Sequence, residues 1–162
     1  MNLKRILPAL IITAIIATVA VAQYSAKEHG TQAKKPDLTG TWIVNVTPQG
    51  EGAPPPFKAL ASFHSDGTMV ETESDTLIPP FITPGHGVWS KVDRNEFTFL
   101  LIFLTFDNQG NFTGTAKARS NGAFDGPDAY TDRATVEFFD ADGNFLFGGE
   151  AIGEGRRITL EP

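Results

Sequence analysis

From residue 38 onward, apolar and polar side chains alternate along the chain with a period of two, and Gly, Pro, Asn and Asp collect between the alternating segments. This period puts successive side chains on opposite faces of a β-strand, so that one face can meet a core. No segment shows the 3.6-residue period of a helix. The predicted strands are 39–47, 57–64, 68–74, 86–92, 96–106, 111–119, 130–139 and 144–151, with a short ninth candidate at 156–160. Eight strands joined mostly by short turns predict an all-β fold, an eight-stranded antiparallel up-and-down β-barrel.

Three of the predicted turns resemble one another, because each has a phenylalanine four residues before a glycine. They cover residues 63–69, 106–112 and 139–145. The glycine supplies the positive φ of a tight hairpin turn, and a preceding Ser or Asp can accept hydrogen bonds from the turn backbone. The third turn contains Asp140, Asp142 and Asn144, which also suit a calcium loop, but an EF-hand needs further ligands and flanking helices. The repeat therefore favours hairpins.

Residues 1–22 differ in composition from the rest of the chain. Lys4 and Arg5 precede a nearly continuous apolar run that ends in the small-x-small sequence Ala20-Val21-Ala22. These are the features of a secretory signal peptide cleaved near Ala22. The alternative is an uncleaved membrane anchor, although the apolar run is shorter than the roughly 20 residues that span a bilayer. Residues 23–37 are polar without a period and predict a flexible leader, which leaves 38–162 for the barrel.

The predicted cleavage places the protein outside the cytoplasm, secreted or periplasmic, with no membrane span in the mature chain. Loss of residues 1–22 leaves 11 Lys and Arg against 19 Asp and Glu, a net charge of −8. Nucleic acid is not an expected partner, since its binding requires a basic face. The chain has no cysteine, which excludes disulfides, thiolate metal sites and a cysteine nucleophile. Its three histidines are far apart in sequence, so neither a metal site nor a cofactor is expected.

Two predicted strands carry small residues on one face, and that face is expected to point into the barrel. In 111–119 these are Gly114, Ala116 and Ala118, which would leave space inside. In 130–139 the same parity holds Tyr130, Asp132, Ala134, Val136 and Phe138. Asp132 is the exception, a carboxylate on an otherwise mostly apolar face.

The segment 97–106 is apolar on both faces, unlike the strands around it. An outward apolar face must be covered by another part of the chain or by a partner. The sequence therefore also allows a homodimer, or a non-catalytic interaction protein, that uses this strand.

Loop lengths indicate where a barrel mouth would lie. The connections 48–56 and 75–85 follow the first and third strands, so they share an end in an up-and-down barrel. The second is rich in proline and large apolar residues, which suits a loop that covers the barrel or a ligand. The polar connection 120–129 falls at the opposite end and is expected to be peripheral. The residues predicted to lie near a ligand are Phe81, His86, Trp89, Tyr130 and Asp132.

Acid–base chemistry is a second possibility at this end of the barrel. Glu71 and Glu73 lie near the end of the third strand, and His86 begins the fourth, so Glu73 and His86 can face each other. A histidine beside a carboxylate can act as a general acid and base. The catalytic candidates are His86, Glu73 and Asp132; a surface ion pair is the competing interpretation. There is no nucleophile elbow, phosphate loop or dinucleotide fingerprint.

Three features of the sequence together resemble the calycin or lipocalin-like superfamily: the strand Gly40-Thr41-Trp42, the number of strands, and the pair Arg156-Arg157. The resemblance implies that Trp42 packs under Arg156 or Arg157, a cation–π contact that closes one end of the barrel. The strand pattern also resembles the allene-oxide-cyclase-like barrels. The first resemblance implies binding of an apolar or amphipathic small molecule in the interior. The second implies a cofactor-free isomerase or cyclase that uses His86 with Glu73 or Asp132.

Overall fold

A computed structural model describes residues 36–74 and 81–160, which contain nine strands and no helix. The strands are β1 (Gly40–Gln49), β2 (Phe57–Phe63), β3 (Thr68–Glu73), β4 (Phe81–Ile82), β5 (Gly85–Lys91), β6 (Glu96–Phe106), β7 (Phe112–Phe124), β8 (Ala129–Asp140) and β9 (Phe145–Arg157). The predicted signal peptide, nearly all of the predicted leader, and residues 75–80 of the predicted mouth loop lie outside the described residues.

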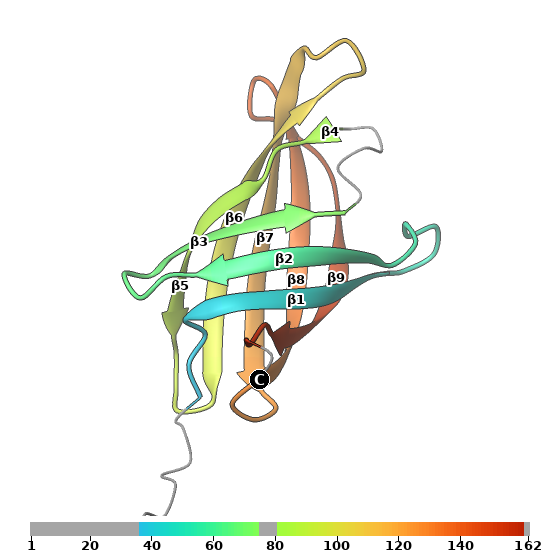
Figure 1. Ribbon diagram of the computed structural model, residues 1–162. Coiled ribbons are helices and arrows are strands. Elements are labelled where there is room, and N and C mark those ends of the chain that lie inside the picture. Colours follow the sequence, from blue (N-terminus) through green and yellow to red (C-terminus); the bar gives the residue numbers. More distant parts are fainter. Residues whose placement is uncertain (1–35, 75–80, 161–162) are drawn as a thin grey trace, which may run out of the picture. The chain divides into compact units, whose positions relative to one another are not determined.

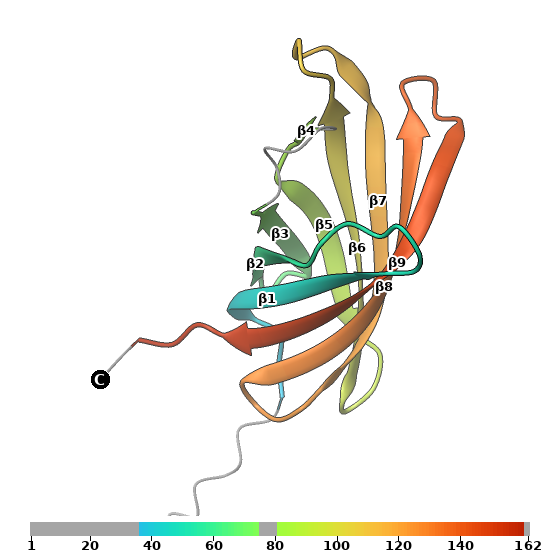
Figure 2. The same ribbon diagram turned by 90° about the vertical axis from the view of Figure 1, so that its right-hand side faces the viewer.

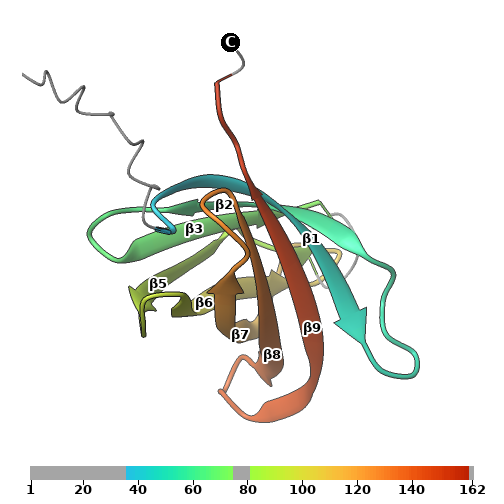
Figure 3. The same cartoon turned by 90° about the horizontal axis from the view of Figure 1, so that it is seen from below.

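Eight of these strands form a closed antiparallel barrel (Figures 1 and 2). The pairs run in chain order from β1 through β3, then through β5 to β9. Pairing of β9 with β1, from Trp42 opposite Arg157 to Gln49 opposite Glu150, closes the ring. The view from below shows the strands following one another around it (Figure 3). The predicted eight-stranded barrel is thus confirmed.

Because neighbouring strands are antiparallel, the connections alternate between two ends of the barrel. We call the end that holds the connections after β1, β3, β6 and β8 the mouth, and the end that holds the turns after β2, β5 and β7 the closed end. The short strand β4 lies on the mouth side, where Phe81 pairs with Phe106 and Ile82 with Thr105 of β6. This strand falls inside the connection that the sequence treated as a loop.

Two other predicted boundaries are wrong, and both concern the second half of the chain. The segment 120–129 is not a peripheral loop, because β7 runs on to Phe124 and β8 starts at Ala129. The alternation of inward and outward side chains in residues 112–119 continues into this segment. We predicted a loop because the segment is rich in Ser, Asn and Gly. There is also no separate strand at 156–160, since β9 continues to Arg157 and ends there.

The closed end is filled by aromatic side chains packed around Trp42, which is fully buried. The Trp42 indole Nε1 donates a hydrogen bond to the Leu38 carbonyl at 2.7 Å. The Arg157 guanidinium lies 4.2 Å from the centre of the indole and pairs with Asp128 at 2.9 Å. Of the two arginines named from the sequence, Arg157 makes this contact, and Arg156 is exposed on the outer face.

The three repeated turns have the same backbone hydrogen bonds, as expected for hairpins. In each, the glycine N–H donates to the carbonyl three residues before it; for Gly143 the acceptor is Asp140, at 3.0 Å. Gly110 and Gly143 have φ values of 82° and 86°, a region that favours glycine. Each of the two mouth turns is also held by an aspartate side chain, Asp107 or Asp140, which accepts hydrogen bonds from the backbone N–H and the side-chain amide of the asparagine four residues later, Asn111 or Asn144.

Strand β6 carries apolar side chains on both faces, as the sequence indicates. Its inward residues Phe97, Phe99, Leu101 and Phe103 are buried. On the outer face Leu100 and Ile102 are half-buried, and Leu104 is 43% exposed. Self-association through this face stays a prediction.

Candidate functional site

Four polar side chains meet inside the barrel and form what we call the interior cluster: Glu71 on β3, Ser120 on β7, and Tyr130 and Asp132 on β8. Each occupies an inward position of its strand, in phase with buried apolar neighbours such as Met69 and Ala118. Glu71 is 8% exposed, Asp132 6%, Tyr130 2% and Ser120 0%. Carboxylates this deeply buried are uncommon unless they are paired, so the cluster is the unusual feature of the core.

The two acids come from opposite walls of the barrel. Around the ring, β3 and β8 are separated by four steps in either direction. Both acids project inward, and the negative charge of Asp132 acts on Glu71. Their charges therefore meet across the interior and not along one strand.

The neighbours of Asp132 on both adjacent strands are glycines. Asp132 is opposite Gly122 on β7 and opposite Gly153 on β9. A Cβ at Gly153 would overlap Asp132 Oδ1, and one at Gly122 would lie 2.8 Å from the Asp132 Cβ. The Ser120 hydroxyl donates a hydrogen bond to Asp132 Oδ2. The glycines thus make room for the carboxylate, and Ser120 orients one of its oxygens.

Burial changes the protonation of both acids. It raises the pKa of Glu71 from 4.5 to about 7; the charge of Asp132 adds to the rise, and a hydrogen bond with Glu73 opposes it. Burial also raises the pKa of Asp132 from 3.8 to about 6, against the effect of the Ser120 hydrogen bond. Both carboxyl groups therefore have pKa values raised towards neutral pH, the range that suits a general acid or base.

Tyr130 connects the cluster to the aromatic closed end. Its ring lies 4.9 Å from that of Trp42 and 5.2 Å from that of Phe97, both in edge contacts. Its hydroxyl has no hydrogen-bond partner among residues 36–74 and 81–160. Burial and the charges of Asp132 and Glu71 raise the pKa of Tyr130 well above its usual value. A buried hydroxyl without a partner is costly, and most such groups are satisfied by protein, water or a ligand.

Towards the mouth the inward positions are small or partly exposed. Ala59, Ala116, Ala118 and Ala151 are buried there. Several inward residues are only half-buried, namely Val46, Glu73, Ala134, Val136 and Phe138. These inward side chains are therefore partly accessible to solvent at this end. The interior cluster lies between this accessible half and the aromatic closed end.

The structure brings together only part of the predicted site. Tyr130 and Asp132 belong to the interior cluster, and Glu73 faces inward beside Glu71. His86 is exposed on the outer face of β5, opposite Ile102 of β6, so it does not meet Glu73 inside the barrel. His86 lies at the start of β5 and so near the mouth, as the sequence indicates. It occupies an outward position of the strand, because it directly follows the inward residue Gly85.

Two of the three predicted aromatic contacts lie outside the interior cluster. Trp89 is at the closed end, where its Nε1 donates to the His64 carbonyl at 2.9 Å and its ring meets Phe63. Phe81, in β4, is half-buried next to Phe106 at the mouth. Neither is part of the interior cluster.

Ser120 and Glu71 are the cluster members that the sequence did not assign to the site. Ser120 was placed in a loop, although its parity with Ala116 and Ala118 indicates an inward position. Glu71 was noted only as a polar residue near the mouth, although it alternates in phase with Met69. In both cases the period-two pattern indicates an inward position. We did not assign it because the residue is polar.

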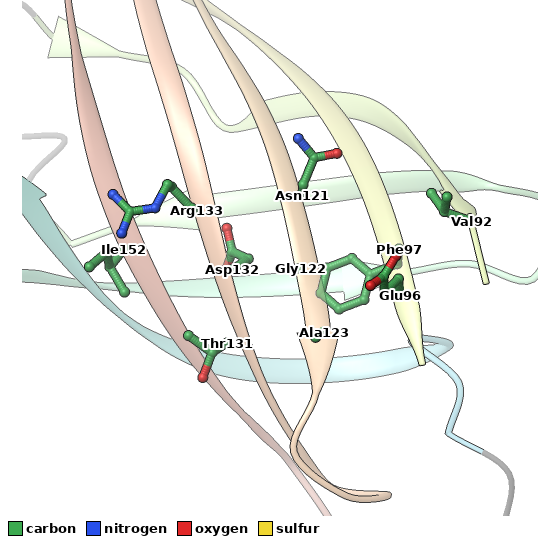
Figure 4. Close-up of a pocket in the computed structure, with 10 residues that line it drawn as sticks. All are labelled: Val92, Glu96, Phe97, Asn121, Gly122, Ala123, Thr131, Asp132, Arg133 and Ile152. Atoms are coloured by element: carbon green, nitrogen blue, oxygen red, sulfur yellow. The ribbon is translucent and has the colours of Figure 1, made fainter. Parts of the chain in front are cut away.

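A separate open groove of about 580 Å³ lies over β6 to β9 (Figure 4). Its lining combines outward residues such as Asn121 and Arg133 with Phe97 and Asp132, which lie on either side of Gly122. Asp132 thus belongs both to the interior cluster and to the lining of this groove.

Within the described residues, no group of three His, Cys, Asp or Glu side chains is arranged to hold a metal ion. The described residues contain no helix that is long and apolar enough to cross a membrane. The chain matches no protein-family model and no curated protein with significant similarity.

Proposed function

We propose that this protein is an exported, calycin-like barrel that binds an apolar or amphipathic small molecule in its interior, entered from the mouth. The observation that carries the proposal is the interior itself: small or half-buried inward residues lie above a buried polar cluster. Binding sites for small molecules usually combine apolar walls with a few polar groups that orient the ligand. The Trp42–Arg157 contact supports the calycin-like assignment.

A pair of neighbouring substitutions tests interior binding. Ala134→Phe puts a large side chain on the inward face at a half-buried position, and Thr135→Phe puts the same side chain on the exposed outer face. Native mass spectrometry of protein purified from its own host should show a bound small molecule in the wild type and in Thr135→Phe, but not in Ala134→Phe. Equal loading of all three proteins, or no ligand in any of them, would contradict the proposal. Melting temperatures establish that both variants are folded.

An isomerase or cyclase is the second candidate, and the altered protonation of Glu71 and Asp132 favours it. One carboxyl would donate a proton and the other would accept one, without His86. Incubation of the released ligand with fresh protein should then yield an isomer of unchanged mass and different chromatographic retention. Glu71→Gln with Asp132→Asn should abolish this conversion. A ligand returned unchanged by the wild type would leave binding as the function.

Export is tested separately by the N-terminal sequence of the protein recovered from its host. Cleavage after Ala22 gives a mature chain that begins at Gln23. An intact N-terminus on membrane-associated protein would support the anchor instead.

A further inference from the structure

We propose that the interior ligand carries a primary ammonium group, held by Glu71, Asp132 and the Tyr130 hydroxyl, with its apolar part directed towards the mouth. The ligand class is therefore an amphipathic amine. This inference rests on the proposed function and adds the chemistry of the ligand's polar end.

The first support is that the two acids have no cationic partner. The only inward cations on the described strands are Lys91 and Arg157, both at the closed end. Lys91 donates to the Pro36 carbonyl at 2.7 Å, and Arg157 is engaged by Asp128 and Trp42. The other cations near the cluster, such as Arg133 on β8, point outward. Buried carboxyl groups are either paired with a cation or neutralised by a proton. No side chain of the described residues supplies the cation, so a positive charge on the ligand is what would keep both acids ionised.

The second support is the set of free acceptors. Ser120 occupies Asp132 Oδ2, and no group in the described residues bonds to Asp132 Oδ1. The hydroxyl of Tyr130, a residue that is only 2% exposed, likewise has no partner there. An ammonium group has three donors and no acceptor, which suits two carboxylates and a hydroxyl oxygen. A carboxylate or phosphate on the ligand would instead be repelled by both acids.

The aromatic surroundings are also compatible with a cation. The ring of Tyr130 contacts those of Phe97 and Phe63, and aromatic faces attract ammonium groups. Towards the mouth, Ala134, Val136 and Phe138 offer an apolar wall to the rest of the ligand. The polar end therefore lies deep and the apolar end lies near solvent.

Isothermal titration with three probes of equal chain length tests the charge: octylammonium, 1-octanol and octanoate. We expect octylammonium to bind about tenfold more tightly than octanol, because hydrogen bonds that involve a charged group are stronger than those between neutral groups. Octanoate should bind least. Glu71→Gln with Asp132→Asn should remove the preference for the amine. Glu154→Gln, on the exposed outer face of β9, changes the net charge by one and should preserve it.

The outcomes separate this inference from the proposed function. If octanol binds as well as octylammonium and Ala134→Phe blocks both, interior binding stands and the ammonium site is refuted. If the double variant still prefers octylammonium, the amine binds at the acidic surface and the inference is again refuted. If no probe binds and Ala134→Phe leaves the host-derived ligand in place, both proposals fail.

Discussion

Glu71→Gln should make the protein more stable at pH 8 and change little at pH 4.5. The pKa of Glu71 rises from 4.5 to about 7 in the folded protein. Between these values the folded state binds more protons than the unfolded state, so the free energy of unfolding falls as the pH rises. The contribution of the neutral carboxyl is complete below pH 4.5 and is lost by about pH 7.

The size of the effect follows from the difference in pKa. One pKa unit is worth about 1.4 kcal/mol, so ionisation of buried Glu71 destabilises the folded state by about 3 kcal/mol above pH 7. Glutamine keeps the shape of the side chain and cannot ionise. The variant should therefore exceed the wild type by up to about 3 kcal/mol at pH 8. At pH 4.5 most of this difference should be absent.

Urea unfolding at the two pH values measures this difference, with tryptophan fluorescence as the signal because Trp42 is fully buried. Glu154→Gln removes an exposed carboxyl from β9 and serves as the control, with little change at either pH. The Glu71→Gln variant could instead be less stable than the wild type at pH 8, or its free energy of unfolding could change equally at both pH values. Either result would refute the conclusion that burial raises the pKa of Glu71.

Three further substitutions test other parts of the barrel by urea or thermal unfolding. Arg157→Leu should destabilise the protein by about 2–3 kcal/mol, because it breaks the ion pair and hydrogen bonds at the closed end, whereas exposed Arg156→Leu should change stability by less than about 0.5 kcal/mol. Gly153→Ala should cost about 1–3 kcal/mol, since its Cβ overlaps a buried carboxylate, while Gly149→Ala has open space and should be tolerated. Asp140→Ala should lower the melting temperature at pH 7 and have no effect in strong acid, since hydrogen bonds from Asn144 lower the pKa of Asp140 and are lost as it protonates.

The barrel itself could be predicted from the sequence because its main signals are local. A period of two, glycine turns and a first-strand tryptophan are each visible within a few residues. The Trp42–Arg157 contact joins residues far apart in the chain, and the resemblance to calycins was needed to expect it. The boundary of β7 was missed because Ser120 and Gly122 have the composition of a loop, and the pairing with β8 outweighs that local preference.

The interior cluster could be predicted only in part, because it depends on which strands face each other. Asp132 was identified by its own strand, as a carboxylate on an apolar face. Its encounter with Glu71 requires the order of strands around the barrel and the inward direction of both. The expected pair of His86 and Glu73 assumed that both face inward, and a one-residue difference in parity puts a side chain on the opposite face of a strand.

The two aspartate turns at the mouth also bear on how the barrel forms. Each is held by bonds among neighbouring residues, and each follows an irregularity in strand register, after Thr105 in one hairpin and after Phe138 in the other. Contacts between residues close in sequence form early, whereas pairing of distant segments is slow. The hairpins β6–β7 and β8–β9 should therefore appear first in refolding, and the β1–β9 seam, where Trp42 meets Arg157, should form last. The contact between Arg157 and Trp42 would then form in the final step of folding. Its loss should speed unfolding far more than it slows folding.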